Sequence, residues 1–171
     1  MKSVPAIAAL VCSGISLSAQ SVQEARTLFH QAYASKEAAS SFRQLMHMAP
    51  DVPLLQGYKG LSEIMICPYL LNPFSKLSGF NKGRHILEQA IMREPANIEL
   101  HFLRFAVQTN APAILGYNTN IAQDKSLLNN YLQYNAGNNP ELYSMIVHYL
   151  LRSGFCTANE KLRIKQYTQT P

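Results

Sequence analysis

The chain has 171 residues, of which 47% are apolar and 15% are charged, and its 15 lysines and arginines exceed its 10 aspartates and glutamates, for a formal net charge of +5. The apolar fraction is typical of a globular protein, and the low charged fraction excludes a disordered acidic or basic tail. The cations are spread along the chain, whereas a nucleic-acid-binding surface would concentrate them, so we expect no nucleic-acid partner.

Residues 1–19 have the pattern of a secretory signal peptide. A positive start is followed by the segment from Val4 to Leu17, which is nearly free of polar bulk, and then by small residues around Ala19. The apolar run is shorter than the roughly 20 residues that span a bilayer. We therefore expect cleavage after Ala19, a single mature domain over residues 20–171, and export to a periplasm or secretion.

Along the rest of the chain, apolar residues recur at the three-and-four spacing of amphipathic helices. No segment alternates long enough to predict a strand. In chain order, the expected helices are Val22–Tyr33, Ala38–Met46, Leu54–Met65, Phe80–Ile91, Leu100–Val107, Leu128–Leu132, Leu142–Tyr149 and Thr157–Gln169. The sequence therefore predicts an all-α fold, with the apolar stripes as its core.

Helix-start signals support several of these elements. Ser21 with Glu24, and Thr157 with Glu160, match the capping box, in which a hydroxyl and a carboxylate satisfy amides of the first turn. Asn139 stands before a proline and a glutamate, which is a second kind of helix start. Helices are accordingly expected to begin at all three places.

Two connections, residues 67–78 and 110–119, are longer than a helix pair requires, and both contain prolines. Long loops in compact domains are often functional. We expect these two to fold back over helix ends and to bury their apolar side chains. Those side chains are Tyr69, Leu70, Leu71, Phe74, Ile114 and Leu115.

Export would leave Cys67 and Cys156 in an oxidising compartment, where two thiols can form a disulfide. Two buried free thiols are an equal alternative.

Neither cysteine has another cysteine or a histidine at ligand spacing, and no two of the five histidines are three or four residues apart. We therefore expect no metal site and no cofactor. No phosphate-binding glycine loop and no nucleophile elbow is present, so no catalytic residue is assigned.

A spaced pattern recurs in two of the expected helices. A small residue, two apolar residues and a proline have the same spacing in residues 38–50 and in residues 83–95. The residues that carry it are Ala38, Phe42, Leu45 and Pro50, and then Gly83, Leu87, Ala90 and Pro95. The pattern resembles the second helix of a tetratricopeptide repeat. The 45-residue interval between Pro50, Pro95 and Pro140 lies in the range of about 40–47 residues of other helical hairpin arrays.

This resemblance implies a fold and no chemistry. The expected fold is a right-handed array of about four antiparallel helix pairs, a TPR-like α-α superhelix with two long loops. More loosely, the chain resembles small exported helical-repeat proteins of no assigned activity.

Stacked helical hairpins expose a curved face that suits a peptide or a protein segment. We therefore expect a monomeric, non-enzymatic binding or scaffold module whose concave helical face takes a protein or peptide partner in the cell envelope. The residues expected to line that face are Tyr58, Lys59, His101, Arg104, Gln108 and Tyr117.

The alternative is an enzyme or a small-ligand-binding protein with a site under the two long loops. Its pocket would be formed by Tyr117, Asn110, Asn72 and Lys76, with His85 or His101 as the titratable group. No nucleophile, base and orienting residue are recognisable together, which weakens this alternative.

Basic residues cluster in residues 76–93 and in residues 161–165. They are interpreted either as solvated surface or as contacts with an acidic partner or with anionic lipid headgroups. The second cluster lies on the last expected helix, which we expect to cap the array by burying Leu162 and Ile164.

Overall fold

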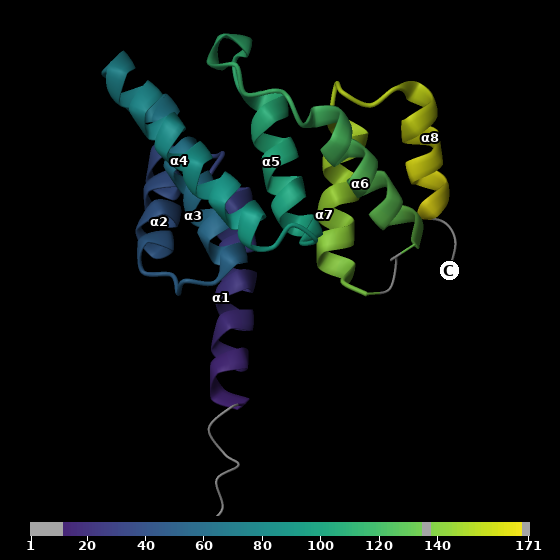
Figure 1. Ribbon diagram of the computed structural model, residues 1–171, viewed down its shortest axis with the longest axis horizontal. Helices are drawn as coiled ribbons and strands as arrows, with labels where there is room; N and C mark the ends of the chain where they lie inside the picture. Colours follow the sequence, from purple (N-terminus) through teal and green to yellow (C-terminus); the bar gives the residue numbers. More distant parts are fainter. Residues whose placement is uncertain (1–11, 135–137, 169–171) are drawn as a thin grey trace, which may run out of the picture. The chain divides into compact units, whose positions relative to one another are not determined.

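The computed structural model describes residues 12–134 and 138–168, and the side chains within these ranges from Ser21 onward. Over these residues the protein is all-helical, and no strand is present (Figure 1). The helices are α1 Cys12–Gln31, α2 Lys36–His47, α3 Pro53–Met65, η1 Cys67–Tyr69, α4 Pro73–Arg93, α5 Ile98–Asn110, η2 Ala113–Leu115, α6 Ile121–Tyr134, α7 Pro140–Arg152 and α8 Ala158–Tyr167. Each expected helix corresponds to one of the eight α-helices, so the all-α prediction is confirmed.

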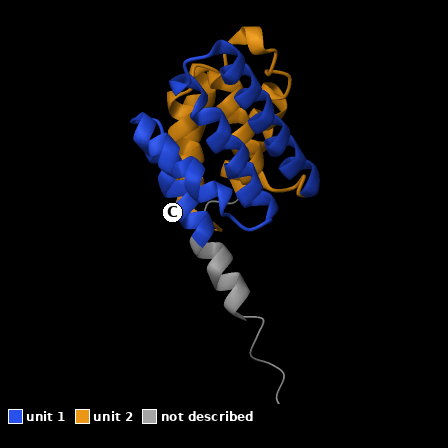
Figure 2. Cartoon of the chain, turned by 90° about the vertical axis from the view of Figure 1, so that its left-hand side faces the viewer, with its two compact units in different colours: residues 1–93 blue, residues 94–171 orange. Residues whose placement is uncertain are grey.

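Residue contacts divide the chain into two compact units, Met1–Arg93 and Glu94–Pro171, which are called unit 1 and unit 2 below (Figure 2). The division falls at the turn before Pro95, one of the three regularly spaced prolines. A single helical-repeat domain over residues 20–171 stays a prediction.

Helix starts agree with the sequence where a side-chain cap is available. Thr157 and Glu160 form the complete capping box at α8, and the side chain of Asn139 accepts from Leu142 N at α7. The expected start at Ser21 is wrong for the full chain, because α1 begins at Cys12 and passes through Ser21 without interruption. Residues 1–11 of the expected signal peptide lie outside the described residues, and the signal peptide itself stays a prediction.

Unit 1 is built on a close crossing of α3 and α4. A Cβ atom added to Gly60 would lie 2.6 Å from the backbone oxygen of Gly83, and one added to Gly83 would collide with the backbone oxygen of Gly60. The small residue of the repeated pattern therefore allows the two backbones to touch. Around this pair, Tyr58 packs against Phe29 of α1 and Phe42 of α2, with ring centroids 6.3 and 6.4 Å apart.

Unit 2 has its own apolar core. Tyr149 of α7 lies edge-on to Phe102 and Phe105 of α5, at centroid distances of 5.5 and 6.0 Å. Helix α8 packs on α6 and α7. Only one of its two expected core residues takes part: Ile164 is fully buried, whereas Leu162 is 58% exposed.

The expected loop over residues 67–78 is wrong in most of its length. It contains η1, and α4 begins at Pro73, because Asn72 Oδ1 accepts from Phe74 N and the proline needs no amide partner in the first turn. The segment 110–119 is irregular apart from η2 and turns at Gly116, whose φ of 59° suits glycine.

The expected burial of the loop side chains is also wrong for three of them. Leu71, Phe74 and Ile114 are 99%, 82% and 93% exposed, while Tyr69, Leu70 and Leu115 are half-buried. Neither loop is therefore closed over an apolar interior. Among the described helices, none is both long enough and apolar enough to cross a membrane.

Candidate functional site

Unit 1 contains a buried carboxylate surrounded by basic side chains, which we call the Glu63 cluster. Glu63 of α3 is 2% exposed. Arg43 Nε of α2 donates to its Oε2 at 3.0 Å, and Lys82 Nζ of α4 donates to its Oε1 at 2.7 Å. His47 Nε2 of α2 lies 3.1 Å from Oε1. Three helices thus meet at one carboxylate.

Local sequence explains the geometry of the Glu63 cluster. Arg43 and His47 are one turn apart, so they share one face of α2. Lys82 precedes Gly83, where α4 comes closest to α3. Burial raises the pKa of Glu63, but the hydrogen bonds and positive charges of Lys82 and Arg43 outweigh that effect and bring the pKa below its ordinary value. The carboxylate is therefore an anion that holds its cations in place.

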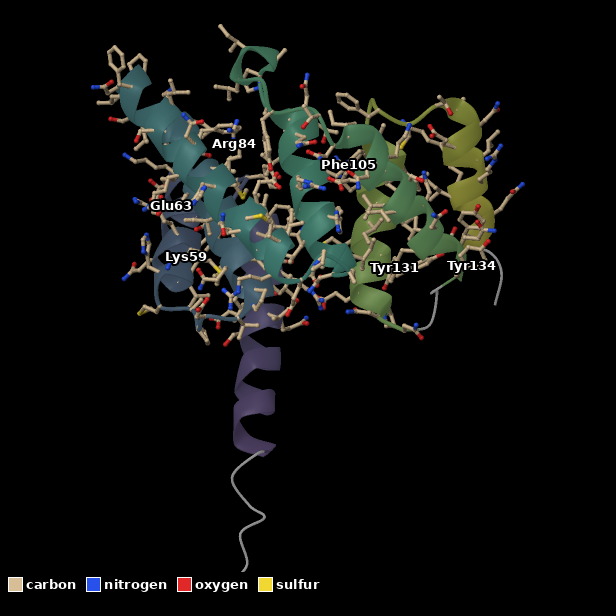
Figure 3. All side chains as sticks on the ribbon, viewed as in Figure 1. Lys59, Glu63, Arg84, Phe105, Tyr131 and Tyr134 are labelled. Carbon is tan, nitrogen blue, oxygen red and sulfur yellow. The ribbon has the colours of Figure 1, made fainter. Side chains whose placement is uncertain are left out.

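The basic side chains of the Glu63 cluster keep exposed surface and N–H donors that do not contact Glu63. Arg43, His47 and Lys82 have side chains that are 41%, 45% and 52% exposed. Within the described part of the chain, the two terminal nitrogens of Arg43 have no acceptor. Lys59 lies one turn before Glu63 on α3, and Figure 3 labels both residues. The cluster therefore presents more positive than negative charge to solvent, in a fixed arrangement.

Unit 2 contains a second buried carboxylate, which organises the Asp124 cluster. Asp124 of α6 is fully buried. Arg104 of α5 donates to both of its oxygens, from Nε at 2.8 Å and from Nη2 at 2.7 Å. His101 Nδ1 lies 2.9 Å from Asp124 Oδ1, and His101 Nε2 lies 2.9 Å from the backbone oxygen of Pro95.

Both ring nitrogens of His101 face acceptors, which favours the imidazolium, because only that form donates from both nitrogens. The hydrogen bond to Asp124 accordingly raises the pKa of His101 above its ordinary value. Burial acts to raise the pKa of Asp124, but Arg104 and His101 bring it below its ordinary value. The histidine and aspartate are spaced like a catalytic pair, yet the second nitrogen of the histidine is bonded to the backbone. The cluster therefore stabilises unit 2 and offers no available base.

Neither carboxylate was expected from the sequence. Asp124 stands in the first turn of α6, where an acidic residue is ordinary. The sequence offered only the spacing of His101 and Arg104, which lie three residues apart on one face of α5. The structure buries both side chains, and their counter-ion comes from another helix.

The residues expected to line a concave face are distributed over both units. Tyr58 and Lys59 belong to unit 1, and His101, Arg104, Gln108 and Tyr117 belong to unit 2. Lys59 is half-buried and the other five are buried. The structure brings His101 and Arg104 together at Asp124. Gln108 exchanges hydrogen bonds with Asn120 at the start of α6.

The polar residues of the alternative pocket have local structural roles. Asn72 caps α4, and Lys76 Nζ donates to the backbone oxygen of Pro68. Asn110 donates to the backbone oxygen of Ala106 and to the hydroxyl of Tyr149. His85 is exposed on α4.

Cys67 and Cys156 are both buried free thiols, one in each unit. Cys67 Sγ donates to the backbone oxygen of Glu63 at 3.1 Å. Burial raises the pKa of both thiols, so both are poor nucleophiles in the folded protein.

Comparisons of the chain with protein-family models, with curated proteins and with solved structures found no match. Among the residues that the structure describes, no three histidines, cysteines or acidic residues are grouped so as to hold a metal ion.

Proposed function

We propose that the protein is an exported, non-enzymatic binding module of TPR-like helical-hairpin architecture, and that unit 1 holds an acidic segment of a protein partner at the Glu63 cluster. The observation that supports this most directly is the surplus of half-exposed basic groups fixed around one buried carboxylate. Of the residues expected on the binding face, Lys59 adjoins this cluster.

The Glu63 carboxylate lowers the entropic cost of binding a partner to Arg43 and Lys82. It restrains Arg43 and Lys82 before a ligand arrives, so less side-chain entropy is lost when they contact one. The two terminal nitrogens of Arg43, with four N–H groups, and two N–H groups of Lys82 are left for carboxylates of the partner. An arginine fork suits a carboxylate especially well. Because these groups are close to solvent, the attraction should weaken as salt is added.

The alternative function is an enzyme or small-ligand-binding protein with a site under two loops. The structure of these loops weakens it. The 67–78 segment is mostly helical, and the exposed side chains of Leu71 and Ile114 leave the loops open. His101, which that function offered as its titratable group, is bonded at both ring nitrogens. No specific observation favours this second function.

A labelled oligoglutamate peptide tests the proposed function by fluorescence anisotropy at low and high salt. The protein should bind it at low salt and release it at high salt, and Arg43→Gln should weaken binding about tenfold, the equivalent of about 1.4 kcal/mol. The matched control is Arg163→Gln on α8, an exposed arginine outside the cluster. Circular dichroism checks that both variants fold.

An Arg43→Gln protein that binds oligoglutamate as tightly as the wild type would refute the assignment of the site. Equal weakening by Arg163→Gln would attribute the binding to overall charge and not to the Glu63 cluster. Absence of any oligoglutamate binding at low salt would refute the acidic partner.

A further inference from the structure

The amino end of α4 carries a group of large apolar side chains in contact with solvent. Leu71, Phe74 and Leu77 are 99%, 82% and 48% exposed. Phe74 and Leu77 are three residues apart on the same side of the helix start, and Leu71 lies two residues before the helix. In Figure 1 these first turns of α4, at the upper left, project beyond α2 and α3. We call this region the α4 tip.

The charged residue nearest in sequence to the exposed apolar side chains of the α4 tip is positive. No aspartate or glutamate occurs between Glu63 and Glu88, whereas Lys76, Lys82 and Arg84 all lie in that interval. Lys76 Nζ is held at the tip by its hydrogen bond to the backbone oxygen of Pro68, at 3.1 Å. The amino end of a long helix adds partial positive charge. An anionic surface is therefore complementary to the tip.

Backbone polar groups at the α4 tip have hydrogen-bond partners within the chain, so they depend less on water. Asn72 Oδ1 accepts from Phe74 N at 2.8 Å, and Pro73 has no amide to satisfy. Lys76 N donates to the backbone oxygen of Asn72, which closes the first turn. Because the amides of Phe74 and Lys76 already have partners, this helix end can enter the headgroup region at a lower cost than an uncapped one.

We propose that the α4 tip docks on the surface of a lipid bilayer that contains anionic lipids, with Phe74 and the two leucines at the boundary between headgroups and acyl chains and Lys76 at the phosphates. A bilayer suits a projecting tip because it needs no matching hollow. A second copy of the chain meeting it tip to tip would have only these three apolar side chains to cover, whereas a stable interface buries roughly 1,000 Å². The docking is weak and reversible, as expected for a few apolar side chains with a small positive charge.

This inference is independent of the proposed peptide site, and vesicle flotation with the full chain tests it. The probes are vesicles of phosphatidylcholine alone and of phosphatidylcholine mixed with phosphatidylglycerol. The wild type should float with the mixed vesicles and much less with phosphatidylcholine alone. Phe74→Ser should reduce the bound fraction about tenfold, and Lys76→Gln should remove most of the preference for anionic vesicles.

Ile114→Ser is the matched control, because Ile114 is 93% exposed and lies in unit 2, away from the tip in sequence. It should bind vesicles as the wild type does. Equal binding by Phe74→Ser, or no flotation with anionic vesicles, overturns the proposal. Concentration-dependent dimerisation that Phe74→Ser abolishes would instead assign the tip to a second copy.

The same variants separate this inference from the proposed function. Phe74→Ser should keep oligoglutamate binding, and Arg43→Gln should keep vesicle binding. If the wild type binds oligoglutamate and not anionic vesicles, only the proposal for the α4 tip fails, and in the reverse case only the proposed function fails.

Discussion

At the scale of single residues, a buried charge is stable here only with its partners, and Asp124 is the clearest case. Asp124→Asn would remove the buried carboxylate that Arg104 and His101 both contact. We expect unit 2 to lose about 3–5 kcal/mol of stability, measured by urea unfolding. The control is Asp51→Asn, since Asp51 is 77% exposed in its ion pair with Arg93 and should matter by at most about 1 kcal/mol. Equal effects of the two substitutions would contradict the structural role of the Asp124 cluster.

The same cluster predicts how stability depends on pH. The folded-state pKa of His101 is raised from 6.5, so its contribution is complete below that value and is lost as the pH rises through the folded-state pKa. The folded-state pKa of Asp124 is lowered from 3.8, so its contribution is present above that value and is lost as the pH falls through the folded-state pKa. Unit 2 should therefore be most stable in weakly acidic solution.

Urea midpoints measured across pH check this dependence. His101→Gln should remove the loss of stability on the alkaline side of the maximum and keep the loss in acid. A wild-type midpoint that is constant from weakly acidic to weakly alkaline solution would show that His101 is not held as an imidazolium.

Residue-level patterns predicted some features of the structure and missed others for identifiable reasons. The capping box of Thr157 and Glu160 could be predicted because all of its groups lie within one turn. The same pattern at Ser21 was wrong, because a local pattern does not say whether preceding residues extend the helix. Glu63 and Asp124 were missed because their partners come from neighbouring helices, and pairing between helices is not visible in local spacing.

At the scale of helices, the crossing of α3 and α4 depends on two glycines. Alanine normally stabilises a helix relative to glycine by roughly 0.5–1 kcal/mol. At Gly60 or Gly83 the added methyl group would instead meet backbone oxygen, which cannot move aside as a side chain can. We expect Gly60→Ala and Gly83→Ala each to destabilise unit 1 by about 1–3 kcal/mol.

Thermal unfolding measures this effect, with Gly154→Ala as the control. A Cβ atom at Gly154 would meet nothing within 4 Å, and its φ is not positive, so the change should be close to neutral. A neutral or stabilising effect at both Gly60 and Gly83 would show that the two helices do not cross with their backbones in contact.

Helix α8 offers a second test at this scale. Ile164→Ala should destabilise unit 2 by about 2–5 kcal/mol, because Ile164 is fully buried, whereas Leu162→Ala should change stability by at most about 0.5 kcal/mol. Thermal unfolding of both variants is the measurement. A comparable loss in the two variants would restore the expectation that both residues are buried.

The existence and order of the helices could be predicted because the apolar periodicity extends over many residues. The buried side of α8 and the start of α4 could not be predicted. Residues 162 and 164 are two positions apart on a helix and face different sides, so periodicity alone did not show which one docks. Asn72, Pro73 and Phe74 are consistent with a turn or with a helix start. The segment was expected to be a loop because it contains Pro68 and Pro73, and the second of these prolines instead opens α4.

At the scale of the whole molecule, the sequence predicts one repeating array, and the structure has two compact units that meet in sequence at Arg93 and Glu94. The repeated pattern of Gly83, Leu87 and Ala90 reports how α4 packs on α3, and it carries no information about how successive hairpins join. The regular interval between prolines marks where helix pairs end, and one of these ends is the boundary between the units. Local spacing therefore predicts pairs of helices and not their grouping into units.

The two buried thiols allow the division of the chain into two units to be tested, because Cys67 reports on unit 1 and Cys156 reports on unit 2. Burial and the raised pKa of each thiol should make alkylation slow until the surrounding unit unfolds. Alkylation in increasing urea, followed by mass spectrometry of the separate cysteine peptides, gives one midpoint for each unit. In Asp124→Asn the midpoint of Cys156 should fall while that of Cys67 stays in place, and in Gly83→Ala the reverse should hold. If both thiols shift together in both variants, the chain unfolds as one cooperative domain, because a loss of stability in either unit would then be shared by the whole molecule.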